Sequence, residues 1–365
     1  MPHNGLAPRS AAATLLLIFF AAHIALLPRT LEDLDSINFA LGVRAFDVAR
    51  HQPHPPGYPV FIALAKVSTA AFRAAAFDAP AARGLAIWSA LAGTLALPML
   101  LLLFRSLERR EHLAWWAACA IGAAPLYWST ALRPLSDMTG FVFATAAQAL
   151  LLSAIADRLS PPRDRAMPGA SLSFGLMSPA RAVILAGLLA GLALGVRSQT
   201  GVLTFPLLLV VLAVAGRIIP TGARAAALAA AAVGVLCWGI PLIVASGGLS
   251  SYLHALGAQA GQDFSGVVML WTHRTPRVAA NALLNSFVWP WGRRLGFTVC
   301  GLAAVGSARL LWRSPRAALV LVVSFGPYAV FHLLFHETET VRYALPLLPP
   351  IVYLAMAAVD VQRLR

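Results

Sequence analysis

The stretch Leu31–Phe61, LEDLDSINFALGVRAFDVARHQPHPPGYPVF, interrupts a chain that is otherwise almost uniformly apolar. It gathers acidic residues, histidines and prolines directly after the first long apolar run. Residues 35–50 predict a short helix, because Phe39, Val43 and Phe46 recur at helical spacing and form one apolar face. The prolines of HQPHPPGYP fix φ and remove backbone donors, so this segment predicts a turn rather than a continuing helix. How the stretch is placed decides the orientation of everything that follows it.

The composition indicates a membrane protein. The 365 residues are 59% hydrophobic and 12% charged, with a mean hydropathy of +0.75. Soluble domains carry about twice that charged fraction, and about 20 apolar residues suffice to cross a bilayer. We expect an all-α polytopic fold with about ten transmembrane helices and two or three interfacial juxtamembrane helices. The expected spans are 11–28, 83–104, 112–131, 138–156, 181–196, 200–216, 224–246, 296–312, 317–335 and 343–361.

The charge distribution predicts the orientation of these spans. The net charge of +14 does not indicate a nucleic-acid partner, because the arginines are scattered between apolar runs instead of forming one patch. With a cytoplasmic N-terminus, the inner segments carry the larger net positive charge, as the positive-inside rule requires. The abundance of Ala and Arg over Lys is typical of a GC-rich bacterial genome. We therefore expect the inner membrane of a bacterium, with both termini cytoplasmic.

The segment 57–77 is apolar enough to be read as a further span. However, Lys66, Thr69 and Arg73 fall on one helical face, which favours a helix lying in the membrane interface. A crossing here would also turn the basic segment RSLERREH (105–112) outward, against the charge rule. We expect a single membrane domain, 1–365, without a soluble C-terminal domain. Its first extracytoplasmic loop, 29–82, would hold two juxtamembrane helices, and 246–296 would be a second large outer loop.

Ionisable residues, whose placement at membrane depth is energetically costly, gather on the outer side of this topology. Ionisable groups at membrane depth are functional candidates by default. A carboxylate can take a proton from an acceptor hydroxyl, and an arginine can pair bidentately with a phosphate. Together they fit group transfer from a lipid phosphate. The candidates expected near this one interface are Asp33, Asp35, Asp137, Arg197, His336, Glu337, Glu339 and Arg342.

Each candidate also has a purely structural explanation. Asp35 and Asp137 could cap helices, and Arg342 could extend to lipid headgroups. Arg197 could mark the turn between two helices, and His54 could be an ordinary loop residue. His336, Glu337 and Glu339 could lie on the rim of a site without touching its ligand.

The ordered set of motifs resembles the GT-C class of membrane glycosyltransferases, particularly its protein O-mannosyltransferase and aminoarabinose-transferase branch. An acid leads a short helix, and the turn PHPPGYP (53–59) opens a second one. The segments that follow are ARGLAIWSALAG (82–93), RPLSDM (133–138), GLALGVRSQTG (191–201) and RYALPLLPPIVYLA (342–355). The resemblance implies an inverting glycosyltransferase that takes a sugar from a polyprenyl-phosphate donor on the extracytoplasmic side.

The resemblance also implies residue roles. Asp35 matches the general base, Asp137 the acid after the third span, and Arg342 the residue that binds the donor phosphate. Relatives often carry an acidic pair where this chain has Asp35–Ser36, so Asp33 stays an alternative or additional base. The other residues expected to bind substrate are His54, Tyr58, Arg197, His336 and Glu339.

Metal use and the acceptor stay open. Asp33, Asp35 and Asp137 are candidate ligands for Mg²⁺ or Mn²⁺, and no other cofactor is indicated. The expected partners are a polyprenyl-phosphate-linked sugar and membrane lipids, with no nucleic acid and an unidentified acceptor. A lipid or saccharide transporter or flippase is the alternative function, although no internal repeat of the kind common in transporters is visible. A non-enzymatic partner in an envelope complex is a third possibility.

Overall fold

The structure is a computed structural model that describes residues 7–108, 110–159, 177–216 and 218–359. Within these residues the only β feature is a bridge between Asp47 and Gln52. The α-helices are α1 (Ala7–Ala25), α2 (Leu34–Arg44), α3 (Pro59–Ala74), α4 (Pro80–Glu108), α5 (Glu111–Gly122), α6 (Pro125–Thr130), α7 (Asp137–Leu159), α9 (Pro179–Val196), α10 (Gly201–Val214), α11 (Thr221–Ala245), α12 (Leu249–Gly266), α13 (Pro276–Leu283), α14 (Arg293–Arg313), α15 (Pro315–Phe335) and α16 (Leu348–Val359). The 3₁₀ and π turns are η1 (Val48–Arg50), η2 (Ser198–Thr200), η3 (Leu284–Val288), η4 (Trp289–Trp291) and η5 (Val341–Leu347).

The membrane-spanning character expected from the composition is confirmed. Among the described residues, 7 helices are long and apolar enough to cross a bilayer. Two shorter apolar helices, Ala12–Ala25 and Ser198–Val214, accompany them. The chain is therefore an all-α, multi-pass membrane protein, and by these criteria its described part has fewer full-length spans than the expected ten. The seven are Pro80–Glu108, Asp137–Ala156, Pro179–Val196, Thr221–Ala245, Arg293–Arg313, Pro315–Phe335 and Val341–Val359.

One expected span is broken. The expectation of a continuous helix over 112–131 is wrong, because α5 ends at Gly122 and α6 begins at Pro125. Ala124 between them is extended, with φ −67° and ψ 133°. A proline lacks the amide donor and disfavours helical backbone in the preceding residue, which accounts for the break.

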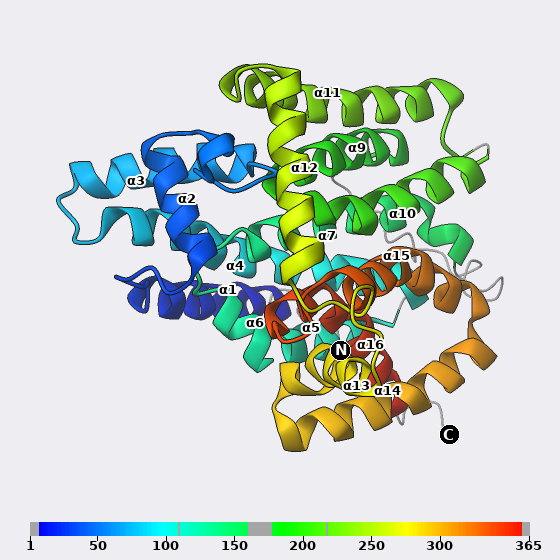
Figure 1. Cartoon of the computed structure of the whole chain (residues 1–365). Helices are drawn as coiled ribbons and strands as arrows, with labels where there is room; N and C mark the ends of the chain where they lie inside the picture. Colours follow the sequence, from blue (N-terminus) through cyan, green and yellow to red (C-terminus); the bar gives the residue numbers. More distant parts are fainter. Residues whose placement is uncertain (1–6, 109, 160–176, 217, 360–365) are drawn as a thin grey trace.

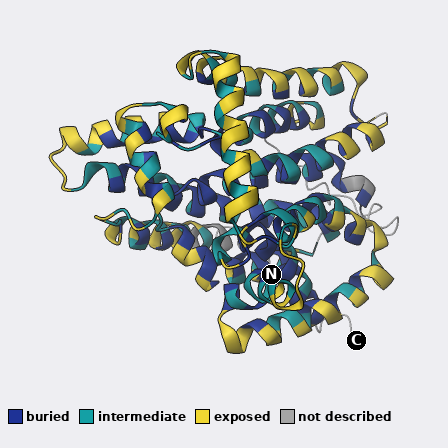
Figure 2. Ribbon diagram, in the orientation of Figure 1, coloured by how far each residue is buried: buried dark blue, intermediate teal, exposed yellow. Residues whose placement is uncertain are grey.

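The long helices share one buried core. Helices α4, α7, α9 and α11 pack in sequence against one another, and α14 packs against α16 (Figure 1). Figure 2 shows the buried residues where these helices face each other, whereas α12 has no buried residue and runs across the bundle. Helix α2 likewise runs across the direction of α1 and α4 (Figure 1). Helices α2 and α12 thus have the transverse course of juxtamembrane helices.

The first loop differs in detail from the sequence-based expectation. The single helix expected over 35–50 is wrong, because α2 ends at Arg44 and the separate turn η1 follows. Asp47 causes this division, since its Oδ1 accepts hydrogen bonds from the amides of Ala49 (3.1 Å) and Arg50 (3.3 Å). Helix α3 is not among the helices that meet the criteria for a span. It runs back along the first part of α4 as a helical hairpin (Figure 1).

The region 246–296 is largely helical. It holds α12, α13 and the π-helical turn η3. Because α12 crosses from the end of α11 toward α15 (Figure 1), this region covers one end of the bundle. The same end carries the start of α7 and the junction between α9 and α10.

Candidate active site

A buried aromatic cluster fixes the first-loop helices onto the bundle. It joins α2, the start of α3, α4, and the residues that lead into α7 and η2. Its members larger than alanine are Phe39, Tyr58, Phe61, Ile62, Leu85, Leu135 and Val196. Leu135 and Val196 stand two residues before Asp137 and one before Arg197, so packing of this cluster brings the charged residues toward α2.

The proline turn is held tightly against α2. A Cβ added to Gly42 would lie 2.7 Å from Pro53 Cδ and 2.8 Å from its backbone nitrogen, so only glycine allows this approach. Tyr58 has φ 46°, a left-handed backbone that tyrosine rarely adopts. Its hydroxyl lies 3.1 Å from His54 Nε2. The turn therefore places His54 and Tyr58 together at the edge of the site.

Asp33, not Asp35, caps helix α2. The Asp33 carboxylate accepts from the Ser36 amide at 2.8 Å, and the Ser36 hydroxyl accepts from the Asp33 amide at 3.2 Å, forming a capping box. The alternative that Asp35 serves as the cap is therefore wrong. Because Asp35 lies in the first turn of the helix, its carboxylate is free to face other elements.

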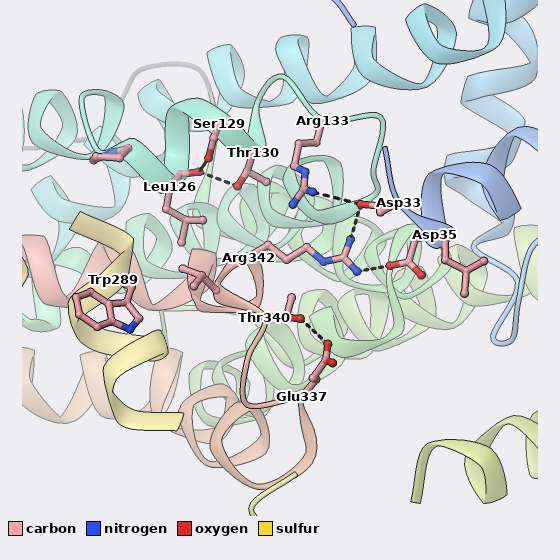
Figure 3. A pocket seen from close by; sticks show the side chains of 13 residues that line it. Asp33, Asp35, Leu126, Ser129, Thr130, Arg133, Trp289, Glu337, Thr340 and Arg342 are labelled. Carbon is pink, nitrogen blue, oxygen red and sulfur yellow. Dashed lines mark hydrogen bonds and ion pairs between the residues drawn. The ribbon is translucent and has the colours of Figure 1, made fainter. Parts of the chain in front are cut away.

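Arg342 connects three carboxylates from two helices. Its Nη2 donates a hydrogen bond to Asp35 Oδ2, and its Nη1 lies 3.7 Å from Asp33 Oδ2 and 3.8 Å from Asp137 Oδ2. Figure 3 shows the guanidinium between Asp33 and Asp35. Arg342 Nη1 and Asp137 Oδ2 are buried without a hydrogen-bond partner among the described residues. A polar ligand would satisfy such groups.

A second arginine, Arg197, faces Asp137 as Arg342 does. Arg197 Nη2 is 3.3 Å from Asp137 Oδ1, and its Nη1 donates to Ser136 Oγ at 3.2 Å. The Arg197 guanidinium also lies over the Tyr343 ring, 5.4 Å from its centroid. Arg197 is buried, so the interpretation of this residue as a mere loop marker does not describe its surroundings.

Three site neighbours were not predicted. Arg133 Nη2 lies 3.4 Å from Asp33 Oδ2, and Ser136 and Tyr343 contact Arg197 as described. Arg133 and Ser136 belong to the motif RPLSDM, and Tyr343 directly follows Arg342. Their closeness in sequence to the predicted residues was therefore the signal that could have identified them.

The electrostatics keep Asp35 ionised and His54 neutral. Burial would raise the pKa of Asp35, but the Arg342 guanidinium and the His54 ring outweigh it and hold that pKa below its ordinary value. Burial lowers the pKa of His54, against the opposing effect of the Asp35 carboxylate 3.8 Å away. Near neutral pH the site thus offers a carboxylate acceptor beside an uncharged imidazole.

Two cavities meet at the Asp35–Arg342 pair. The first, about 590 Å³, is the one drawn in Figure 3, and its lining includes Asp33, Arg133 and Trp289. The second is larger, about 820 Å³, and opens toward α12. Asp35 and Arg342 line both cavities. Sequence-predicted residues that line the second cavity are His54, Tyr58, Arg197 and His336.

Glu339 does not join this arrangement. Its side chain is exposed, and it lines neither cavity. Glu337, two residues earlier, lines both of them and accepts a hydrogen bond from Thr340. Since the chain leaves α15 as an irregular segment here, the sequence did not show which of the two glutamates lines the cavities.

The three carboxylates do not form a ready metal site. Asp33, Asp35 and Asp137 face the Arg342 guanidinium, which occupies the position that a shared cation would take. In the part of the chain that the structure describes, no group of three or more His, Cys, Asp or Glu side chains is arranged to hold a metal ion. The side chains as placed do not fit a bound Mg²⁺ or Mn²⁺, and metal dependence stays a prediction.

The fold defines a class, the multi-pass membrane proteins with the fold of the GT-C glycosyltransferases. Residues 46–218, just under half of the chain, match the family described as the protein O-mannosyl-transferase TMEM260 N-terminal domain. No curated protein matches the sequence. The resemblance to GT-C glycosyltransferases is confirmed by this match and by the solved structures that share the fold.

Two of those structures contain a bound lipid phosphate. ArnT from Cupriavidus metallidurans, bound to undecaprenyl phosphate, is 14% identical with a TM-score of 0.59, and the match covers 98% of this chain and 61% of ArnT. The oligosaccharyltransferase AglB from Archaeoglobus fulgidus, in complex with an inhibitory peptide and a dolichol-phosphate, is 15% identical with a TM-score of 0.54. That match covers 96% of this chain and 50% of AglB. The chain is thus similar in fold to both while spanning only part of their length.

Proposed function

We propose that this chain is an inverting glycosyltransferase that moves a sugar from a polyprenyl-phosphate donor to an acceptor hydroxyl. The reaction would take place at the extracytoplasmic face of a bacterial inner membrane. The observation that carries the proposal is the Asp35–Arg342 pair at the junction of two cavities. The Arg342 guanidinium is suited to bind a phosphate, and the Asp35 carboxylate is suited to accept a hydroxyl proton. Both groups line both cavities. The lipid phosphates bound to ArnT and AglB support a donor of this class.

We assign the donor to the second cavity. The guanidiniums of the buried Arg197 and the half-buried Arg342 border it, and they provide positive charge for the phosphate. Apolar side chains on the same cavity suit the start of a polyprenyl chain. They include Leu194, Trp238, Leu256, Phe331 and Phe335.

We assign the acceptor to the first cavity. Its lining is rich in polar groups, including Ser129, Thr130, Arg133 and Glu337. Such groups suit a hydrophilic acceptor carrying a hydroxyl. Asp35 lies where the two cavities meet, so its carboxylate can reach the acceptor oxygen while the donor occupies the other side.

The reaction follows from these positions as a single displacement. The donor phosphate competes with Asp35 for Arg342, which weakens the Asp35–Arg342 ion pair and makes Asp35 a stronger base. The acceptor oxygen forms a bond to the sugar C1 while the bond from C1 to the phosphate oxygen breaks. The acceptor proton passes to Asp35, and the electron pair stays on the phosphate, whose added charge Arg342 and Arg197 stabilise.

Asp35 alone has the base role in this scheme. The Asp33 carboxylate already accepts the capping hydrogen bond from Ser36 and lies beside Arg133. Asp33 therefore positions helix α2 and its neighbours, whereas Asp35 is the carboxylate available at the junction.

The proposal is tested with the purified chain in proteoliposomes. Mannosyl and glucosyl undecaprenyl phosphates, labelled in the sugar, are supplied together with a cell-envelope extract as acceptor. The expected result is transfer of label out of the lipid fraction, with an equal amount of undecaprenyl phosphate formed. Movement of the intact labelled lipid across the bilayer, without bond cleavage, would contradict the proposal and favour a flippase.

A further inference from the structure

A line of buried side chains leads from the π-helical turn η3 to the second cavity. Ser286 Oγ lies 2.8 Å from His332 Nε2, and His332 Nδ1 lies 2.9 Å from His336 Nδ1. All three residues are buried, and His336 is 7% exposed. Its remaining ring nitrogen, Nε2, is buried without a hydrogen-bond partner among the described residues. His336 lines the second cavity, and Nε2 is the ring nitrogen that it has left for a ligand there.

Ser286 determines which atom donates and which accepts in each hydrogen bond along this line. The Ser286 hydroxyl lies 2.6 Å from the Ala282 carbonyl oxygen, which can only accept, so the single hydroxyl hydrogen points there. Ser286 Oγ must therefore accept from His332, which places the His332 proton on Nε2. A neutral His332 then has a bare Nδ1, which accepts from His336 Nδ1. The proton of a neutral His336 is thus on Nδ1, and its Nε2 carries a lone pair.

The surroundings keep His336 uncharged and in place. Its ring stacks on Tyr343, with centroids 4.4 Å apart, and meets Phe331 edge to face at 5.1 Å. Burial lowers the pKa of His336 well below its ordinary value, and nearby His332, Arg197 and Arg342 act in the same direction. The end of the line at His336 is therefore a fixed hydrogen-bond acceptor.

We infer that His336 Nε2 accepts a hydrogen bond from a ring hydroxyl of the donor sugar and so helps to select that sugar. The inference depends on the proposed function and specifies how the second cavity holds the donor. A bare nitrogen cannot bind an ionised phosphate oxygen, because both are acceptors. The phosphate is left to Arg197 and Arg342, and the group that meets His336 must carry a hydrogen, as a sugar hydroxyl does. A site built around such a hydroxyl strongly rejects the analogue that lacks it.

The first test needs no ligand. The full chain, labelled with ¹⁵N-histidine in nanodiscs, reports by NMR which ring nitrogen of each histidine carries the proton. His332→Phe and His336→Phe variants assign the signals. We expect His332 protonated on Nε2 and His336 protonated on Nδ1. A proton on His336 Nε2 would overturn the inference.

The second test separates the sugar from the phosphate. Binding of undecaprenyl phosphate and of its mannosyl and glucosyl forms is measured for wild type, His336→Phe and the exposed control His273→Phe. In His336→Phe we expect affinity for a sugar-bearing lipid to fall roughly tenfold or more, with little change for undecaprenyl phosphate itself. The control should match wild type for every lipid.

The outcomes distinguish this inference from the proposed function. An equal loss for lipids with and without sugar, or no loss at all, would overturn the role of His336 while leaving the glycosyltransferase proposal intact. A wild-type protein that binds none of these lipids would contradict the proposed function and, with it, a sugar as the ligand of His336.

Discussion

Arg342 donates a hydrogen bond to Asp35, a residue 307 positions earlier in the chain. The pair ties the first-loop helix α2 to the segment that precedes α16. The second guanidinium nitrogen of Arg342 also faces Asp33 and Asp137. One arginine is therefore shared by three carboxylates in the resting protein, and Arg133 and Arg197 provide further positive charge beside Asp33 and Asp137. In the proposed reaction the donor phosphate competes for this arginine, so the same guanidinium would stabilise the resting site and then the leaving phosphate.

Replacing Arg342 is expected to affect stability and rate differently. Arg342→Gln leaves the buried Asp137 and the half-buried Asp33 and Asp35 short of a cation, which should lower the free energy of unfolding by about 3 kcal/mol. Arg342→Lys keeps the charge but loses the planar fork, so stability should fall less. Both variants should lose about 100-fold or more in transfer rate, because the leaving phosphate is poorly stabilised. Thermal unfolding and initial rates measure these effects, and a wild-type rate in Arg342→Lys would refute the phosphate role.

Asp33→Asn tests whether Asp33 shares the base role. Asparagine caps a helix about as well as aspartate, so α2 should keep its start while the charge is lost. We expect a melting temperature close to wild type and less than about a tenfold loss of transfer, because a weakened pair with Arg133 is peripheral to proton transfer. If Asp33→Asn instead removed activity as completely as Asp35→Asn, the base would be shared between the two residues.

The pH dependence follows from the lowered pKa values of Asp35 and His54. Asp35 stays ionised below the ordinary aspartate range, so the acidic limb of kcat/KM should lie at unusually low pH. In the donor complex Arg342 is engaged by phosphate, so the acidic limb of kcat should lie at higher pH than that of kcat/KM. Coincident limbs for the two profiles would contradict a base released from Arg342.

The same shifts predict how stability changes with pH. The pKa of His54 is lower in the folded than in the unfolded chain, so the unfolded state binds more protons below about pH 6.5. This group therefore makes the folded protein less stable as pH falls through that range. His54→Gln should reduce the acid-induced drop in melting temperature, and an undiminished drop would show that His54 is not the group responsible.

Gly42 is expected to be intolerant of a side chain. Gly42→Ala places a methyl group against Pro53 and should cost about 1–3 kcal/mol of stability, with displacement of the neighbouring His54. Gly257→Ala in α12 is the matched control, because a Cβ there meets nothing within 4 Å. The control should be neutral or more stable by about 0.5–1 kcal/mol. Equal stability of the two variants would argue against tight packing of the turn on α2.

Fold class and much of the site geometry were predictable from the sequence. Long apolar runs can only be satisfied as spanning helices, and the charge rule then brings Asp35, Asp137, Arg197 and Arg342 to one end of the bundle. The structure places these four residues in one ion-pair network. The membrane topology suffices for that prediction, because the prediction requires only that loops on the same side of the membrane lie near each other.

Details that depend on side-chain geometry were not predictable in this way. Whether Asp33 or Asp35 caps α2 depends on the residue at which the helix begins, and this decides which of the two carboxylates is free. The series of contacts from Ser286 through His332 to His336 was also not predictable, because His332 lies within an apolar run and its partner Ser286 is distant in sequence. Pairings of this kind appear only when the helices are packed.

The measurement that tests the central claim most directly is sugar transfer by Asp35→Asn. The matched control is Glu32→Gln, an exposed acid three residues away that lines neither cavity. We predict that Asp35→Asn remains folded and binds glycosylated undecaprenyl phosphate, yet transfers sugar at least about 100-fold more slowly, while the control keeps the wild-type rate. Wild-type transfer by folded Asp35→Asn protein would contradict the account.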